Sequence, residues 1–209
     1  MHIQDGVLSV PILAGGAIGS LAGIFFGLKR VKTEDIPKVA VLSSVFFTVS
    51  LIHVPVGPSC VHPGMNGLIG LILGWTSFPS IFVALVVQSV VLQFGGVTAI
   101  GVNTCASALP AVLLHYTLRR FINSSRTTPF LGGFLFGFLG PLLCAAIVSF
   151  ALILSDRNFY PLISVIFMMH LPISAIEGII SGFAVVYLKK VDPRILEWQR
   201  SNPRCGSTL

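Results

Sequence analysis

Charged residues are scarce in this chain. Only 10% of the 209 residues are Asp, Glu, Lys or Arg, whereas 54% are hydrophobic. Soluble domains carry about 25% charged residues, so this composition excludes an ordinary soluble protein. In lipid, a chain must satisfy its backbone hydrogen bonds internally, and helices do so within each segment. We therefore expect an all-α, multi-pass membrane protein in which residues 1–209 form a single domain.

The motifs of common catalytic sites are also missing. The sequence has no GxxxxGK[ST] phosphate loop, so we expect any ATP hydrolysis to take place in separate partner subunits. It has neither a GxSxG elbow nor an HExxH pair, which leaves an intramembrane hydrolase without a nucleophile or a catalytic metal motif. We predict that the protein is not an enzyme.

Cysteine is rare and irregularly spaced. The chain has four, Cys60, Cys105, Cys144 and Cys205, and no CxxC pair that would indicate a redox or zinc site. Cys105 and Cys144 lie in apolar stretches, so we interpret them as buried core thiols.

Apolar stretches bounded by charges or by Pro and Gly predict seven membrane-spanning helices. They cover residues 8–28, 39–55, 66–76, 80–94, 103–118, 129–154 and 161–188. The third and fourth stretches are shorter than the roughly 20 residues that a spanning helix needs, so we also considered a single merged span.

The positions of the basic residues favour seven spans. Lys and Arg cluster at residues 29–38, 119–126 and 189–204, and only Arg157 stands apart. Seven spans put all three clusters on one side, as the positive-inside rule requires, whereas a merged span puts the second cluster outside. We expect the amino terminus outside and the carboxy terminus inside. These clusters are interpreted as membrane anchors and not as a nucleic-acid surface.

The amino terminus has the donor atoms of a metal chelate. No signal peptide precedes the first apolar run, so we expect a free Met1 amine. This amine, the His2 backbone nitrogen and His2 Nδ1 can close two chelate rings around one ion, and His62, expected on the same outer side, can supply a fourth nitrogen. Four nitrogens in a plane suit Ni²⁺ or Co²⁺, whereas Mg²⁺ and Ca²⁺ prefer oxygen. The alternative is that His2 is only the second residue of a start site.

Ionisable residues within the apolar spans are further candidates, because burying them in a membrane is costly. They are His53, His115, His170 and Glu177. His170 and Glu177 are seven residues apart on one helix face and could line a polar seam. We favour a structural role for Glu177, satisfied by neighbouring hydroxyls or amides such as those of Gln88 or Gln93, and an interfacial position for His115.

The segment 95–104 is too rich in glycine for a stable helix and is expected on the outer side, as an irregular lining beside the His62 loop. Asn103 and Thr104 would be lining groups, helix caps, or partners of a metal-bound imidazole.

Small residues recur at four-residue spacing in the first and last spans, at Gly15, Gly19, Gly23 and Gly27, and at Ser174, Gly178 and Gly182. Such stripes allow close helix packing, either within this chain or against another membrane subunit.

Four segments resemble the CbiM/NikM family, the substrate-capture membrane subunits of cobalt and nickel energy-coupling-factor transporters. They are Met1-His2-Ile3 with Asp5-Gly6, the segment 59–63, the segment 95–104, and the segment 171–178. The resemblance runs from residue 1 to about 188. The sequence departs from the family at 64–66, where a threonine-rich run is expected, and at Phe94, where a histidine is common. These departures leave cobalt or nickel open, although the His62-Pro63 context is closer to cobalt-type members.

The resemblance implies a seven-helix subunit whose amino terminus folds back into a central pocket. The implied metal ligands are the Met1 amine, the amide and imidazole of His2, and the His62 imidazole. Co²⁺ or Ni²⁺ would be the transported substrate, with no organic cofactor. The implied partners are a transmembrane coupling (T) subunit, cytoplasmic ATPase subunits and a small accessory membrane subunit, in a prokaryotic plasma membrane. The alternative is a stand-alone secondary transporter or channel with His170 and Glu177 on its ion path.

Overall fold

The computed structural model describes residues 2–56, 59–93, 95–122, 128–192 and 195–196. The described part of the chain is mostly helical, as predicted. The helices are α1 (Val10–Leu28), α2 (Ile36–Val49), α3 (Asn66–Leu73), α4 (Ser77–Val91), α5 (Ile100–Ile122), α6 (Pro129–Ser155) and α7 (Tyr160–Val191). Short 3-10 turns lie at Thr33–Asp35, Gly74–Thr76 and Arg157–Phe159.

Proline marks the beginnings of several long helices. It occupies the first turn of α1, α2, α6 and α7, where its missing N–H is not needed by the helix ladder. The outer faces of these helices carry exposed apolar side chains, such as Leu21, Phe150 and Phe183. An apolar exposed surface is typical of helices that face lipid.

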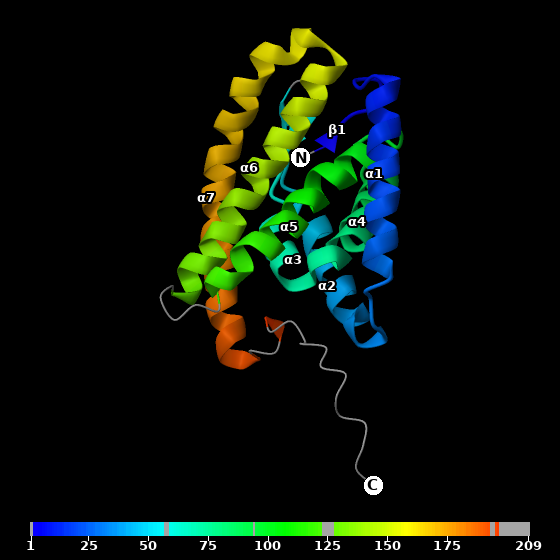
Figure 1. The fold of residues 1–209 in the computed structure, drawn as a ribbon. Coiled ribbons are helices and arrows are strands. Elements are labelled where there is room, and N and C mark those ends of the chain that lie inside the picture. The colour runs from blue at the N-terminus through cyan, green and yellow to red at the C-terminus, as the bar shows by residue number, and fades with distance from the viewer. Residues whose placement is uncertain (1, 57–58, 94, 123–127, 193–194, 197–209) are drawn as a thin grey trace.

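The helices α6 and α7 form a long hairpin whose contact is lined with glycine (Figure 1). A Cβ atom at Gly133 would lie 2.6 Å from the backbone oxygen of Ser181, and one at Gly178 would lie 2.9 Å from the Phe134 ring. The small-residue stripe of the last span therefore packs within this chain.

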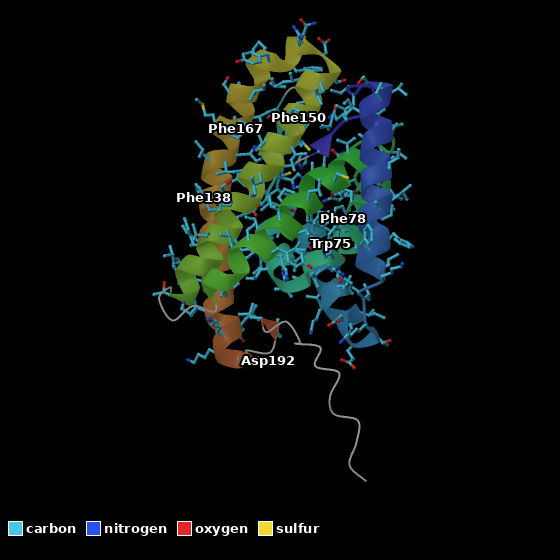
Figure 2. The ribbon with its side chains drawn as sticks, in the orientation of Figure 1. Trp75, Phe78, Phe138, Phe150, Phe167 and Asp192 are labelled. Atoms are coloured by element: carbon cyan, nitrogen blue, oxygen red, sulfur yellow. The ribbon has the colours of Figure 1, made fainter. Side chains whose placement is uncertain are left out.

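The glycine stripe of α1 also packs mainly within the protein. Its contacts are Gly19 with Cys105, Gly23 with Phe78 and Gly27 with Pro79. Phe78 stacks on Trp75 with ring centroids 5.9 Å apart, and both lie beside α1 (Figure 2). A Cβ atom at Gly15 would meet no atom within 4 Å, so this glycine alone of the four stays clear of the rest of the described chain.

Residues 66–91 differ from the prediction of two separate spans. The two stretches are α3 and α4, joined through the turn at Gly74–Thr76, where Gly74 has a φ of +54° that glycine adopts readily. In the described part of the chain, four stretches are long and apolar enough to cross a membrane: Val10–Leu28, Asn66–Val91, Pro129–Ser155 and Arg157–Val191. The predicted count of seven spans, and the orientation drawn from it, are not confirmed.

Two of the basic clusters lie at one end of the bundle. The turn after α1, with Lys29, Arg30 and Lys32, is at the same end as the last turn of α7, with Lys189 and Lys190 (Figure 1). Of the remaining basic residues, Arg126, Arg194, Arg200 and Arg204 lie outside the described residues. The turn between α6 and α7, which contains Arg157, is at the opposite end.

A small antiparallel sheet, which the sequence did not predict, lies among the helices. Its strands are β1 (His2–Ile3), β2 (Val54–Val56) and β3 (Ser59–Val61), in the order β1-β3-β2. His2 pairs with Cys60 and Ile3 with Ser59. Figure 1 shows β1 inside the bundle, so the start of the chain is folded inward.

Gly67 on α3 offers a direct test of this packing. A Cβ atom there would lie 1.8 Å from the backbone oxygen of Phe136, which cannot rotate away. We expect Gly67→Ala to destabilise the protein by about 1–3 kcal/mol or more, because overpacking forces the backbone to shift. Thermal unfolding in detergent measures the effect, with Gly15→Ala as the matched control. Equal melting temperatures for the two variants would contradict the α3–α6 contact.

Candidate metal site

His2 and His62 lie against each other. Their ring centroids are 4.3 Å apart and their planes are inclined by 36°. Both side chains are buried, with exposed fractions of 2% and 4%. The pairing of β1 with β3 brings them together, because it holds His2 beside Cys60, two residues before His62. Met1 lies outside the described residues, so the role of its amine stays a prediction.

The hydrogen bonding of His62 fixes which ring nitrogen can bind a metal. His62 Nδ1 lies 2.8 Å from the Pro63 carbonyl oxygen. A carbonyl only accepts, so Nδ1 carries the proton and Nε2 keeps its lone pair. Burial lowers the pKa of both His62 and His2 well below the ordinary value. Both imidazoles are therefore neutral at pH 7, as metal binding requires.

Asn103 holds the backbone of the first strand. Its Oδ1 accepts from the Ile3 N–H at 2.8 Å, and its Nδ2 donates to the Ile3 carbonyl at 3.0 Å. The Gly96 N–H donates to the same carbonyl at 3.3 Å. Asn103 is thus a positioning group for the residue next to His2, whereas the Thr104 hydroxyl donates to Ile100 within α5. The expectation that either side chain would partner an imidazole is not supported by these contacts.

Asp5 fastens the next turn of the chain to the segment after α4. Its carboxylate accepts from the N–H groups of Val97, at 3.1 Å, and Thr98, at 2.9 Å, and from the Thr98 hydroxyl. The hydrogen bonds from Thr98 lower the pKa of Asp5, so the carboxylate is charged at neutral pH. A Cβ atom at Gly96 would lie 1.9 Å from Asp5 Oδ1, so only glycine fits there. The sequence analysis missed this contact, although Asp5 and Gly96 both belong to the family-like segments.

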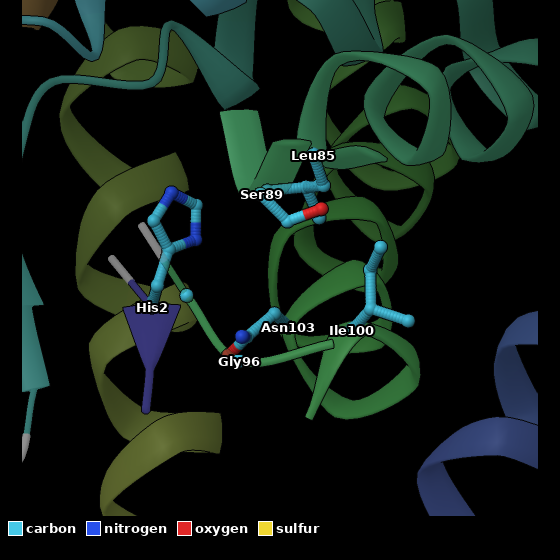
Figure 3. A pocket seen from close by; sticks show the side chains of 7 residues that line it. His2, Leu85, Ser89, Gly96, Ile100 and Asn103 are labelled. Atoms are coloured by element: carbon cyan, nitrogen blue, oxygen red, sulfur yellow. The ribbon is translucent and has the colours of Figure 1, made fainter. Parts of the chain in front are cut away.

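A small cavity adjoins His2. It has a volume of about 10 Å³, roughly the space that one water-sized particle needs. Leu85 and Ser89 of α4 line it together with Ile100 and Asn103 of α5 (Figure 3).

Gln88 of α4 interacts with the His2 side chain. Gln88 Nε2 also donates a hydrogen bond to the Ser50 hydroxyl. Gln88 therefore serves the candidate metal site, and it is not the partner of Glu177 that we expected. Sequence reasoning missed this role because α4 and β1 meet only in the folded chain.

Glu177 has a backbone partner. Its Oε1 accepts from the Gly64 N–H at 2.7 Å. The prediction of Gln88 or Gln93 as its partner was wrong, because the side chain reaches the backbone between His62 and α3.

The remaining histidines take separate positions. His170 is buried, and its Nδ1 donates to the Ile166 carbonyl oxygen at 2.8 Å. His115 is also buried inside the protein, and its Nδ1 contacts the Gly70 carbonyl at 2.9 Å. Its position at the membrane interface stays a prediction. His53 contacts the Leu51 carbonyl.

Side chains alone do not complete a metal site in the described part of the chain. It contains no group of three or more His, Cys, Asp or Glu side chains that could hold an ion. Any site at His2 and His62 must therefore use other donors as well, such as backbone or terminal nitrogen.

Residues 2–195 match the CbiM family, described as the cobalt uptake substrate-specific transmembrane region. The chain belongs to this family. It is accordingly a multi-pass membrane component of metal transport and not an enzyme.

Individual members of the family support the assignment. A Haemophilus influenzae protein named "Putative metal transport protein" is 37% identical over 199 residues. The match covers 94% of this chain and 97% of that protein. The cobalt transport protein CbiM of Sorangium cellulosum is 26% identical, with coverage of 94% and 95%. The crystal structure of a transition metal transporter matches with a TM-score of 0.82 and 25% identity, covering 92% of this chain and 94% of the other.

The Asn103 contacts predict an effect on metal binding without a direct contact to metal. We expect Asn103→Ala to weaken Co²⁺ binding by about 10–100-fold, the range for groups that orient metal ligands. Titration calorimetry on the purified full chain measures it. Thr104→Val, which removes a hydroxyl bonded only within α5, is the matched control. Unchanged affinity in folded Asn103→Ala would contradict the positioning role.

Proposed function

We propose that this chain is the substrate-capture subunit of an energy-coupling-factor importer for Co²⁺ or Ni²⁺. The observation that best supports this proposal is the contact between His2 and His62. Their ring centroids are 4.3 Å apart, although 60 positions separate the two residues in the chain. Two neutral imidazoles, one on the strand β1 and the other just after β3, lie together inside the protein, which favours capture of a nitrogen-preferring ion.

The proposed ligands are the Met1 amine, the His2 backbone nitrogen, His2 Nδ1 and His62 Nε2. This set would form a plane of four nitrogens, which suits Ni²⁺ and Co²⁺ and disfavours the oxygen-preferring Mg²⁺ and Ca²⁺. The terminal amine and the His2 amide must both lose a proton, so binding would release protons and weaken as the pH falls.

We propose partner subunits for two reasons: the sequence has no phosphate loop for ATP hydrolysis, and some relatives are fused proteins. With no phosphate loop in the sequence, ATP hydrolysis is assigned to cytoplasmic ATPase subunits, linked through a transmembrane coupling subunit. A small accessory membrane subunit is supported by the fused nickel transport protein NikMN of Rhodobacter capsulatus, of which this chain matches 65%. We place the capture pocket on the outer face of a prokaryotic plasma membrane, with the basic end of the bundle inside.

The position of the chain start provides the test of this function. One residue added before Met1 converts the amine into an amide and moves His2 to the third position, so tight Co²⁺ and Ni²⁺ binding should be lost. The same residue added after Leu209 is the control and should have no effect. Calorimetry and elemental analysis of the two purified proteins measure the difference. Equally tight binding by both would refute the terminal chelate.

His62 tests the fourth ligand. We expect His62→Ala to abolish tight metal binding while the protein stays folded, because the substitution removes a coordination bond and leaves the β1–β3 backbone pairing in place. Cys60→Ser, at a buried neighbour, is the control and should be mild, since no thiolate is needed in an all-nitrogen set. Normal metal stoichiometry in His62→Ala would show that the ion binds elsewhere.

A further inference from the structure

A row of buried oxygen atoms lies on α7 beyond His170. Ser174, Glu177 and Ser181 share one face of the helix and are each at most 1% exposed. Both serine hydroxyl oxygens and Glu177 Oε2 have no hydrogen-bond partner in the described part of the chain. Buried polar atoms are normally hydrogen-bonded, so three such atoms within two helical turns call for a ligand.

The start of α3 supplies another oxygen to the same place. Gly64 donates to Glu177 Oε1 at 2.7 Å, and a Cβ atom on Gly64 would lie 2.9 Å from Asn66 Oδ1. Asn66 Oδ1 is itself buried and has no hydrogen-bond partner among the described residues. The Glu177 carboxylate and the Asn66 carbonyl therefore flank one glycine.

The backbone of α6 closes the other side of this group. A Cβ atom at Gly137 would lie 2.5 Å from Ser181 Oγ and 2.4 Å from the Glu177 backbone oxygen. The oxygens thus lie between the start of α3, α6 and α7.

The charge of this group favours a cation. Glu177 is the only buried Asp, Glu, Lys or Arg in the described chain. The ion pair found among these residues joins Lys38 to Asp35 at the surface and does not involve Glu177. A carboxylate buried in a membrane protein without a cationic side chain is costly, and a bound cation removes that cost.

We infer that Glu177, Asn66, Ser174 and Ser181 form a second, oxygen-lined station for the transported divalent cation. It lies between the His2–His62 site and the end of α7 that carries Lys189 and Lys190. Glu177 is seven residues beyond His170, about 10 Å along the helix. This inference rests on the proposed function, in which the ion enters at His2 and His62.

The two stations differ in their affinity for the ion because their donor atoms differ. Oxygen donors hold Co²⁺ and Ni²⁺ less firmly than imidazole and amine nitrogen do, so the ion is captured tightly first and held weakly afterwards. Gly64 connects the stations, because it bonds to Glu177 and lies two residues after His62.

Mn²⁺, which prefers oxygen ligands, is a suitable probe for the second station. Electron paramagnetic resonance of the purified full chain in nanodiscs counts bound Mn²⁺. We expect one weak site, retained in His62→Ala and weakened at least about 10-fold in Glu177→Gln, which removes the charge but keeps the shape. Glu34→Gln, the same change in a surface carboxylate, is the control and should bind as the unmodified chain does.

The two metals separate failure of this inference from failure of the proposed function. Tight Co²⁺ binding should survive Glu177→Gln and be lost in His62→Ala. Tight Co²⁺ binding that survives His62→Ala would refute the capture site and leave the Mn²⁺ result to stand on its own. Absence of a Mn²⁺ site in the unmodified chain, or unchanged Mn²⁺ affinity in Glu177→Gln, would overturn the second station.

A second variant covers the case in which Glu177→Gln does not fold. Ser174→Ala combined with Ser181→Ala keeps the carboxylate and removes two proposed oxygen donors. We expect this double variant to weaken Mn²⁺ binding several-fold relative to Ser164→Ala, a serine of α7 whose hydroxyl donates to Pro161. Equal affinities would overturn the proposal.

Discussion

The structure depends on the hydrogen bonding of a two-residue strand that lies inside a helical membrane protein. In such a setting, every N–H and carbonyl of a non-helical segment needs a partner within the protein. The strand β1 pairs with β3 along one edge, and Asn103 and Gly96 form hydrogen bonds to the backbone of Ile3. Asp5 then fastens the following turn to Val97 and Thr98. The direction of the His2 side chain is a consequence of these backbone contacts.

The helices were largely predictable, because long apolar runs leave a chain in lipid few alternatives to helix. The grouping of His2 with His62 was also predictable, since both were expected on one side and in family-like segments. The strands were not, because two or three residues are too few to show an alternating pattern. The partner of Glu177 is the backbone N–H of Gly64. It could not be predicted, because every residue except proline has a backbone N–H and the sequence does not show which one is used. The turn at Gly74 explains why α3 and α4 were predicted as separate spans.

Glycine determines how closely the functional groups approach one another. Gly96 admits the Asp5 carboxylate, and Gly67 and Gly137 allow α3 and α7 to meet the backbone of α6. Larger residues at Gly67 and Gly137 would move α3 and α7, which carry Asn66 and Glu177, away from α6. The small residues that allow close packing in lipid therefore also set the positions of these polar side chains.

In the proposed metal site, the start of the chain itself wraps the ion beside His62. X-ray absorption spectroscopy of the purified, Ni²⁺-loaded chain tests it most directly, because the spectrum reports the geometry, the donor type and the number of imidazoles around the ion. We expect a planar shell of nitrogen donors with the outer-shell scattering of two imidazole rings. A six-coordinate shell dominated by oxygen, or scattering from fewer than two rings, would contradict it.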